Sequence, residues 1–240
     1  MVWAAPFITM FAMASRPIRP GDAVTVAVLV AEMLRRGADA DWSVKAGSLE
    51  WDVERTVVHI LGSLAKHTLY LASRTSRYIA WSGQKFPGAT HADLIHSVEW
   101  CGRALANVAA ETPPDVRAFH TLGMADAEGY VALDCFHMLE HAHDVALGLE
   151  LYFDAPSEIC EAVLARHYPW LPIDAAPWST LLWVAGRTVI PGQDPFDQFI
   201  GPVLAPLAEW DGSIPRHPPK PPTEWVFERE QRRWRPVAAY

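Results

Sequence analysis

The sequence lacks several common signatures of function. Its 240 residues contain no Gly-x-Ser-x-Gly elbow, no phosphate-binding P-loop and no dinucleotide fingerprint, so the chemistries that use those motifs have no support. It has only three cysteines, and their wide spacing forms no Cys-x-x-Cys pair. We therefore expect reduced core thiols in a cytoplasmic protein. These cysteines are Cys101, Cys135 and Cys160.

Basic residues are in deficit. Lysine and arginine total 20 against 28 acidic residues, which gives a formal net charge of −8. The one basic cluster, at 229–235, is short and interrupted by Glu230. A chain of this charge would not gather phosphate backbones, so we expect no nucleic-acid partner.

Long apolar runs are also missing. No stretch reaches the roughly 18 uninterrupted apolar residues of a membrane span, so no membrane association is expected. The apolar residues 1–15 end in small side chains, like a signal peptide, but they lack a positively charged start and contain Pro6. We expect residues 1–20 to form an N-terminal arm that packs on the core, and not an export signal.

Helical periodicity dominates what is present. Half of the residues are hydrophobic and 20% are charged, which is ordinary globular composition. Proline-free periodic segments, bounded by glycine and proline, predict a four-helix domain over 21–155, with Asp22 as a possible cap of the first helix. The loops at 82–88 and around Pro113-Pro114 could each be a crossover. The four predicted helices span 22–36, 52–74, 91–110 and 126–147.

The amino-acid composition changes after Pro156. Most prolines beyond this point stand where they forbid long helices, and tryptophan is frequent. We expect an irregular Pro/Trp-rich C-terminal lobe at 156–240 that wraps the helical domain. Its expected elements are short helices at 157–167 and 178–187 and a small hairpin that pairs 223–228 with 233–237.

Three histidines lie in the predicted core. His137 and His141 are four residues apart, so at about 3.6 residues per turn both imidazoles project from one side of a helix, whereas His143 is turned about 200° from His141. Such pairs also occur on solvated faces, and His59, in an apolar run, could be a hydrogen-bonded core residue. Burying all three is costly without a common partner. We predict that His59, His137 and His141 bind one divalent metal.

Three stretches carry a family resemblance. They resemble the DinB-like helix bundles, and within them the N-terminal domain of mycothiol-dependent maleylpyruvate isomerases, over roughly 22–192. The stretches are AGSLEWDV at 46–53 followed by His59, GMAD at 123–126 leading to HAHDVA at 141–146, and PWSTLL at 177–182 through Gly186-Arg187 and Pro191-Gly192.

The resemblance implies a fold and a site. The fold would be a mainly α, antiparallel four-helix bundle with a long crossover, and the metal would most often be zinc, with nickel or another divalent ion as alternatives. This chain departs from the pattern at His137, where many isomerase-like members carry glutamate. A neutral ligand there leaves the ion one charge more positive, which makes a bound water or thiol more acidic.

Function follows from that resemblance as an expectation. We expect a metal-dependent transferase or isomerase that activates a low-molecular-weight thiol of the mycothiol type, or water, for S-transfer or isomerisation of a small molecule. The alternatives are a biosynthetic or hydrolytic DinB-like enzyme that uses no thiol, and a metal-binding or stress-response protein without turnover. The sequence leaves monomer and homodimer equally open.

Other residues have two interpretations each. Asp144 could orient a ligand imidazole or cap a helix end, and Arg187 could bind an anionic substrate or form a structural salt bridge. Tyr70 could line a cavity or pack, and Trp178 could roof a pocket or fill core. Glu140 is expected on a solvated face, because its side chain should point away from His141.

Overall fold

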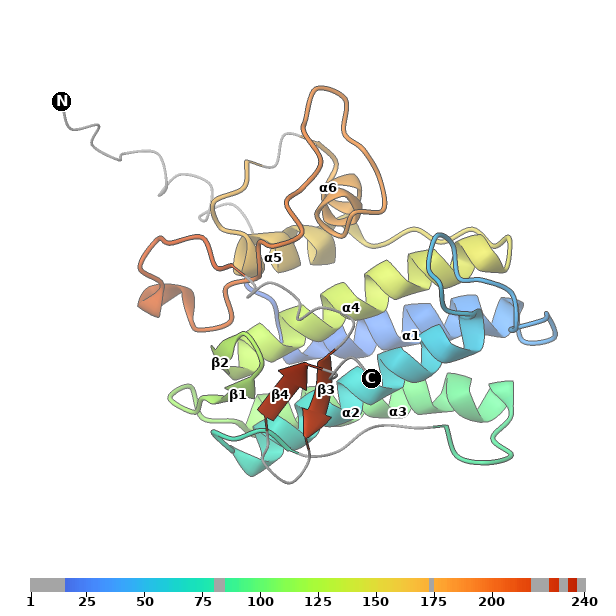
Figure 1. The fold of residues 1–240 in the computed structure, drawn as a ribbon, viewed down its shortest axis with the longest axis horizontal. Helices are drawn as coiled ribbons and strands as arrows, with labels where there is room; N and C mark the ends of the chain where they lie inside the picture. The colour runs from blue at the N-terminus through green and yellow to red at the C-terminus, as the bar shows by residue number, and fades with distance from the viewer. Residues whose placement is uncertain (1–15, 80–84, 173–174, 217–224, 229–232, 237–240) are drawn as a thin grey trace.

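The structure, a computed structural model, describes residues 16–79, 85–172, 175–216, 225–228 and 233–236. The described part of the chain is mainly helical, with short strands at two places (Figure 1). The expected N-terminal arm lies largely outside the described residues, as does much of the chain beyond residue 216.

Four long helices pack against one another. α1 and α2 each contact both α3 and α4. α1 and α4 run in one direction and α2 and α3 in the other (Figure 1). The loop after α1 therefore lies beside the end of α4, where Gly148 meets the Lys45 carbonyl. The four helices are α1 (Pro20–Arg36), α2 (Val53–Ser73), α3 (His91–Glu111) and α4 (Ala127–Gly148).

Side-chain caps set where these helices begin. Asp52 accepts a hydrogen bond from the Arg55 amide at the start of α2, and Asp126 accepts one from the Gly129 amide at the start of α4. The predicted cap of α1 is wrong. α1 begins two residues earlier, at Pro20, and Asp22 lies in its first turn, where its carboxylate accepts from the Arg19 amide.

The central helix is α4. It contacts α1, α2 and α3 on one side and the lobe helices α5 (Ser157–His167) and α6 (Pro177–Val184) on the other. Its side chains are buried in nearly every direction, which explains why its sequence is apolar all round. Most polar side chains on α4 are therefore largely removed from water and need a partner.

Close backbone approach between α1 and α3 depends on Gly102. A Cβ at this position would lie 2.4 Å from the Ala27 Cβ, well inside van der Waals contact. The glycine in mid-helix thus lets the two helices pack closely, which offsets its low helix propensity.

Two short hairpins also form. β1 (Ala118–His120) and β2 (Gly123–Ala125) pair between α3 and α4, and this hairpin was not predicted. β3 (Trp225–Glu228) and β4 (Arg233–Pro236) pair antiparallel, which confirms the small hairpin expected in the lobe.

The second lobe helix is shorter than predicted. α6 ends at Val184, because the chain turns at Gly186, whose φ of +71° lies in the left-handed region. The Arg187 amide then bonds back to the Leu182 carbonyl. This turn frees the Arg187 side chain from the helix and lets it reach α4.

Two expectations from composition can be compared with the described residues. The three cysteines are free, and Cys135 and Cys160 are buried, as expected for reduced core thiols. Within the described ranges, no helix combines the length and the apolar character needed to cross a membrane.

Candidate metal centre

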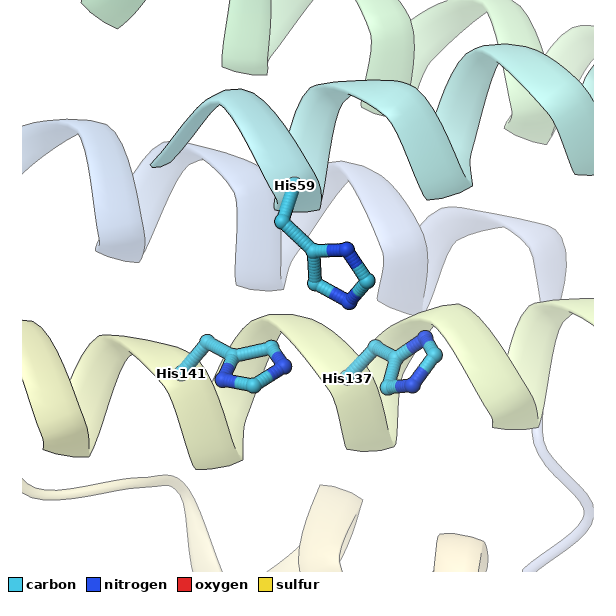
Figure 2. A group of neighbouring side chains, drawn as sticks. All are labelled: His59, His137 and His141. Carbon is cyan, nitrogen blue, oxygen red and sulfur yellow. The ribbon is translucent and has the colours of Figure 1, made fainter. Parts of the chain in front are cut away.

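The three predicted histidines come together. α2 supplies His59, and α4 supplies His137 and His141 from successive turns. One ring nitrogen from each lies within 4.8 Å of the others, and the ring centroids are 5.1–5.7 Å apart. Figure 2 shows the His59 ring reaching from α2 toward the space between the two α4 rings. The predicted clustering of the three histidines is therefore confirmed, and the group could hold a metal ion.

Burial keeps these imidazoles in the form that binds metals. It lowers the pKa of His59 to about 4, with a further contribution from nearby His141. It also lowers the pKa of His137 well below its usual value, again reinforced by neighbouring imidazoles. Near neutral pH both rings are therefore uncharged and offer a lone pair, as a first-row divalent metal requires.

His141 is oriented by a buried ion pair. Its Nδ1 lies 3.1 Å from Asp144 Oδ2, and Asp144 is only 1% exposed. Because a carboxylate only accepts, Nδ1 carries the proton and Nε2 is left free for a metal. Arg187 donates to both oxygens of Asp144, from Nε at 3.1 Å and from Nη2 at 2.9 Å.

The charge of Asp144 is stabilised by these contacts. Burial alone would raise its pKa, but the hydrogen bonds from His141 and Arg187 outweigh burial and lower it. Of the two interpretations of Arg187, the structure shows the salt bridge. Its Nη1 also donates to the Ala185 carbonyl.

The expectation for Glu140 is wrong. Its side chain is only 10% exposed, and Oε1 lies 3.7 Å from Nε2 of both His137 and His141. Oε2 lies 3.7 Å from Arg187 Nη1. Burial raises the pKa of Glu140, although His141 and Arg187 oppose this. The helical wheel fixes only where Cβ points, and the lobe covers the face that the sequence assigned to solvent.

His59 rests on an aromatic neighbour. The Trp51 ring lies edge-on to it at 5.0 Å between centroids, and the Arg55 guanidinium lies 4.7 Å above the Trp51 ring. Sequence reasoning noted Trp51 only as part of a family pattern. Trp51 lies two residues before α2 begins, and the two rings meet about two helical turns further along the chain, at His59.

Two predicted pocket residues lie elsewhere. The Tyr70 hydroxyl accepts from the Ile79 amide, and Tyr70 follows His59 by eleven residues, about 16 Å along a helix. Trp178 contacts His143 and Phe153, with ring centroids 5.9 and 6.0 Å apart. Neither of these contacts is with one of the three clustered histidines.

A cavity of about 560 Å³ lies between α2 and α3. Its lining includes Val58, Leu61 and Cys101 but none of the three histidines. Val58 precedes His59, so this cavity occupies the neighbouring face of the same helix.

Comparison with known proteins adds no relative: no family model, no curated protein and no solved structure matches this chain. The DinB-like assignment therefore stays a prediction.

Proposed function

We propose that this chain is a metal-dependent enzyme of the DinB-like class, which binds zinc or a similar divalent ion through His59, His137 and His141. The observation that carries the proposal is the convergence of three imidazole nitrogens within 4.8 Å. Three histidines with an open fourth position are a common donor set of catalytic zinc sites. The uncharged state of His59 and His137 fits the same use.

The same proposal includes the fold. α1 to α4 would be the DinB-like antiparallel four-helix bundle with a long crossover. Its support is that α1 and α2 each pack against both α3 and α4, while the connections from α1 to α2 and from α3 to α4 join helices with fewer mutual contacts.

The residues around the site have separable roles. When bound, the metal would lower the pKa of a coordinated thiol or water and make it nucleophilic at neutral pH. Asp144 and Arg187 hold the His141 ring, so that Nε2 faces the site. Glu140 places a buried carboxyl oxygen 3.7 Å from two of the ligand nitrogens, within reach of a proton released there.

A low-molecular-weight thiol of the mycothiol type is the proposed cosubstrate, with water as the alternative nucleophile. The reaction would be S-transfer or isomerisation of a small molecule. Support comes from the resemblance and from the all-histidine donor set, which leaves the full charge of the ion available to stabilise a thiolate.

One observation favours a second candidate. The 560 Å³ cavity is lined by residues other than the three histidines, so it does not deliver a substrate to them as it stands. A metal site beside which no substrate binds would serve stability alone. The second candidate is therefore a non-catalytic metal-binding protein.

The first experiment measures metal content. Purified protein should carry about one divalent ion per chain by mass spectrometry, and His137→Ala should lose most of it. His96→Ala is the matched control, because His96 stacks on exposed Trp100 on α3 and should leave metal content unchanged. A metal-free wild-type protein that cannot be loaded with zinc would refute the proposal.

The second experiment separates the two candidates. Calorimetric titration of mycothiol into the zinc-loaded protein should show binding that disappears in the metal-free form. Turnover of an electrophilic acceptor with the thiol present would establish the enzyme. Zinc binding that raises the melting temperature, with no thiol binding and no hydrolysis of model esters or amides, would instead support the non-catalytic candidate.

A further inference from the structure

A buried aspartate–histidine pair lies behind one of the metal-binding histidines. Asp134 on α4 and His67 on α2 are 0% and 2% exposed, and Asp134 Oδ1 lies 2.9 Å from His67 Nδ1. The His67 ring stacks nearly parallel to the His137 ring, with 6.4 Å between centroids and 9° between planes. The pair therefore lies next to one of the three histidines of the candidate metal centre.

Two polar atoms next to this pair have no hydrogen-bond partner among the described residues. Asp134 Oδ2 and His137 Nδ1 are both buried in this state. Asp134 precedes His137 by three residues, so both side chains project from nearly the same side of α4. One atom is an acceptor and the other, once Nε2 binds a metal, is a donor.

The other α4 histidine shows what such a donor needs. His141 places its Nδ1 on a carboxylate three residues after it, Asp144. A metal-binding histidine almost always donates its second ring nitrogen in this way, because the bond fixes the tautomer and the ring orientation. For His137 the corresponding carboxylate would be that of Asp134, three residues before it on α4.

We infer that Asp134, held in place by His67, positions His137 for metal binding by accepting the hydrogen bond from its Nδ1–H, directly or through one ordered water. This inference rests on the proposed metal site. It adds two positioning residues to that site, and it gives each of the two α4 histidines a carboxylate of its own.

The rival explanation is purely structural. A buried Asp–His pair between α2 and α4 also fixes how two helices pack, and removing it would destabilise the fold whether or not a metal binds. That role accounts for the contact between Asp134 and His67. It does not account for two complementary buried atoms left without partners beside it.

Zinc affinity separates the two explanations. Asp134→Asn should weaken zinc binding by about 10- to 100-fold in competition with a chromophoric chelator. Asp126→Asn is the matched control. It makes the same chemical change at a buried aspartate paired with Arg166, eleven residues and about 16 Å before His137 along α4. It should lower stability and leave zinc affinity within about 2-fold of wild type.

Each outcome decides something. Asp134→Asn with wild-type zinc affinity, whatever its stability, overturns the inference and leaves the proposed function standing. A wild-type protein that binds no zinc refutes the proposed function, and the inference fails with it. The cobalt-substituted protein provides a spectroscopic readout, since a tilted His137 ring should change the visible absorption of Asp134→Asn but not of Asp126→Asn.

If Asp134→Asn does not fold, the wild-type protein still decides. In zinc-loaded protein with ¹⁵N-labelled histidine, His137 should bind through Nε2 and show a slowly exchanging Nδ1–H proton. Coordination through Nδ1, or an Nδ1–H that exchanges as fast as an exposed one, would contradict a hydrogen bond to Asp134.

Discussion

The beginning and the end of α4 are each anchored to the C-terminal lobe by an arginine on an aspartate. At the beginning, Arg166 of α5 donates from Nη2 to Asp126 Oδ1 at 2.6 Å. Near the end, Arg187 donates to both oxygens of Asp144. Arg166 and Asp144 are 3% and 1% exposed, so both pairs lie largely away from water.

What surrounds each pair is different. Arg166 also donates to two backbone carbonyls of the lobe, from Nη1 to Val203 and from Nη2 to Leu204. Asp144 instead uses Oδ2 to hold the His141 ring. One pair thus ties two pieces of backbone together, and the other connects the lobe to a candidate metal ligand. The same kind of ion pair can therefore stabilise the packing of the lobe or position a candidate metal ligand, depending on which third group it contacts.

The largest expected effect sharpens this comparison at the architectural end. Arg166→Met should lower the free energy of unfolding by about 3–5 kcal/mol, because it leaves buried Asp126 and two carbonyls without their donor. Urea denaturation measures the change. The zinc affinity of the folded variant should equal that of wild type, since His141 and Asp144 are unchanged.

An exposed pair provides the control for that measurement. Arg35 lies 2.8 Å from Glu99, with its side chain 42% exposed, so Arg35→Met should cost no more than about 1 kcal/mol. Similar losses in the two variants would mean that the burial of Arg166 does not matter, and the architectural role would be refuted.

A smaller effect tests the chemical end. Arg187→Met should weaken zinc binding by about 10- to 100-fold, or about 1.4–2.8 kcal/mol, because Asp144 loses the contacts that hold it against His141. Arg187→Lys keeps the charge but not the two-pronged geometry, so its affinity should be intermediate. A variant that loses stability but keeps wild-type zinc affinity would make the two ends of α4 equivalent and break the comparison.

Much of the fold could be predicted from local patterns. Helical periodicity and breakers located the four long helices to within a few residues, because amphipathic stretches and caps are written in contiguous sequence. The β1–β2 hairpin was missed because its strands have three residues each, too few to show an alternating pattern. The early end of α6 depends on the turn at Gly186, which the periodicity alone did not reveal.

The candidate site, too, could be predicted only in part. His137 and His141 were predictable from their spacing on one helix, and His59 from its unusual place in an apolar run. Glu140 was not, because its burial depends on the lobe that covers that face of α4. The roles of Arg187 and Asp134 follow from which side chains face them across helix contacts, and a single sequence does not state those contacts.

The last prediction concerns pH and compares His59 of α2 with the Arg166 pair at the beginning of α4. In the metal-free folded protein the pKa of His59 falls to about 4, against 6.5 for an exposed imidazole. Between these values the unfolded chain binds more protons than the folded one, so stability rises with pH there and is lost as pH falls from about 6.5 to 4. His59→Gln should flatten this part of the profile of unfolding free energy against pH.

Arg166→Met should lower that whole profile but keep a rising slope between pH 4 and 6.5, because His59 is unchanged. His96→Gln, at an α3 position stacked on Trp100, should leave both the level and the slope unchanged. The opposite result would be a slope between pH 4 and 6.5 that survives His59→Gln and disappears in Arg166→Met. The acid sensitivity would then come from the Arg166–Asp126 pair, and His59 would not be a buried neutral imidazole. Metal binding should not remove this slope: a bound ion keeps the ring unprotonated to lower pH, so the rise of stability with pH should extend below about pH 4.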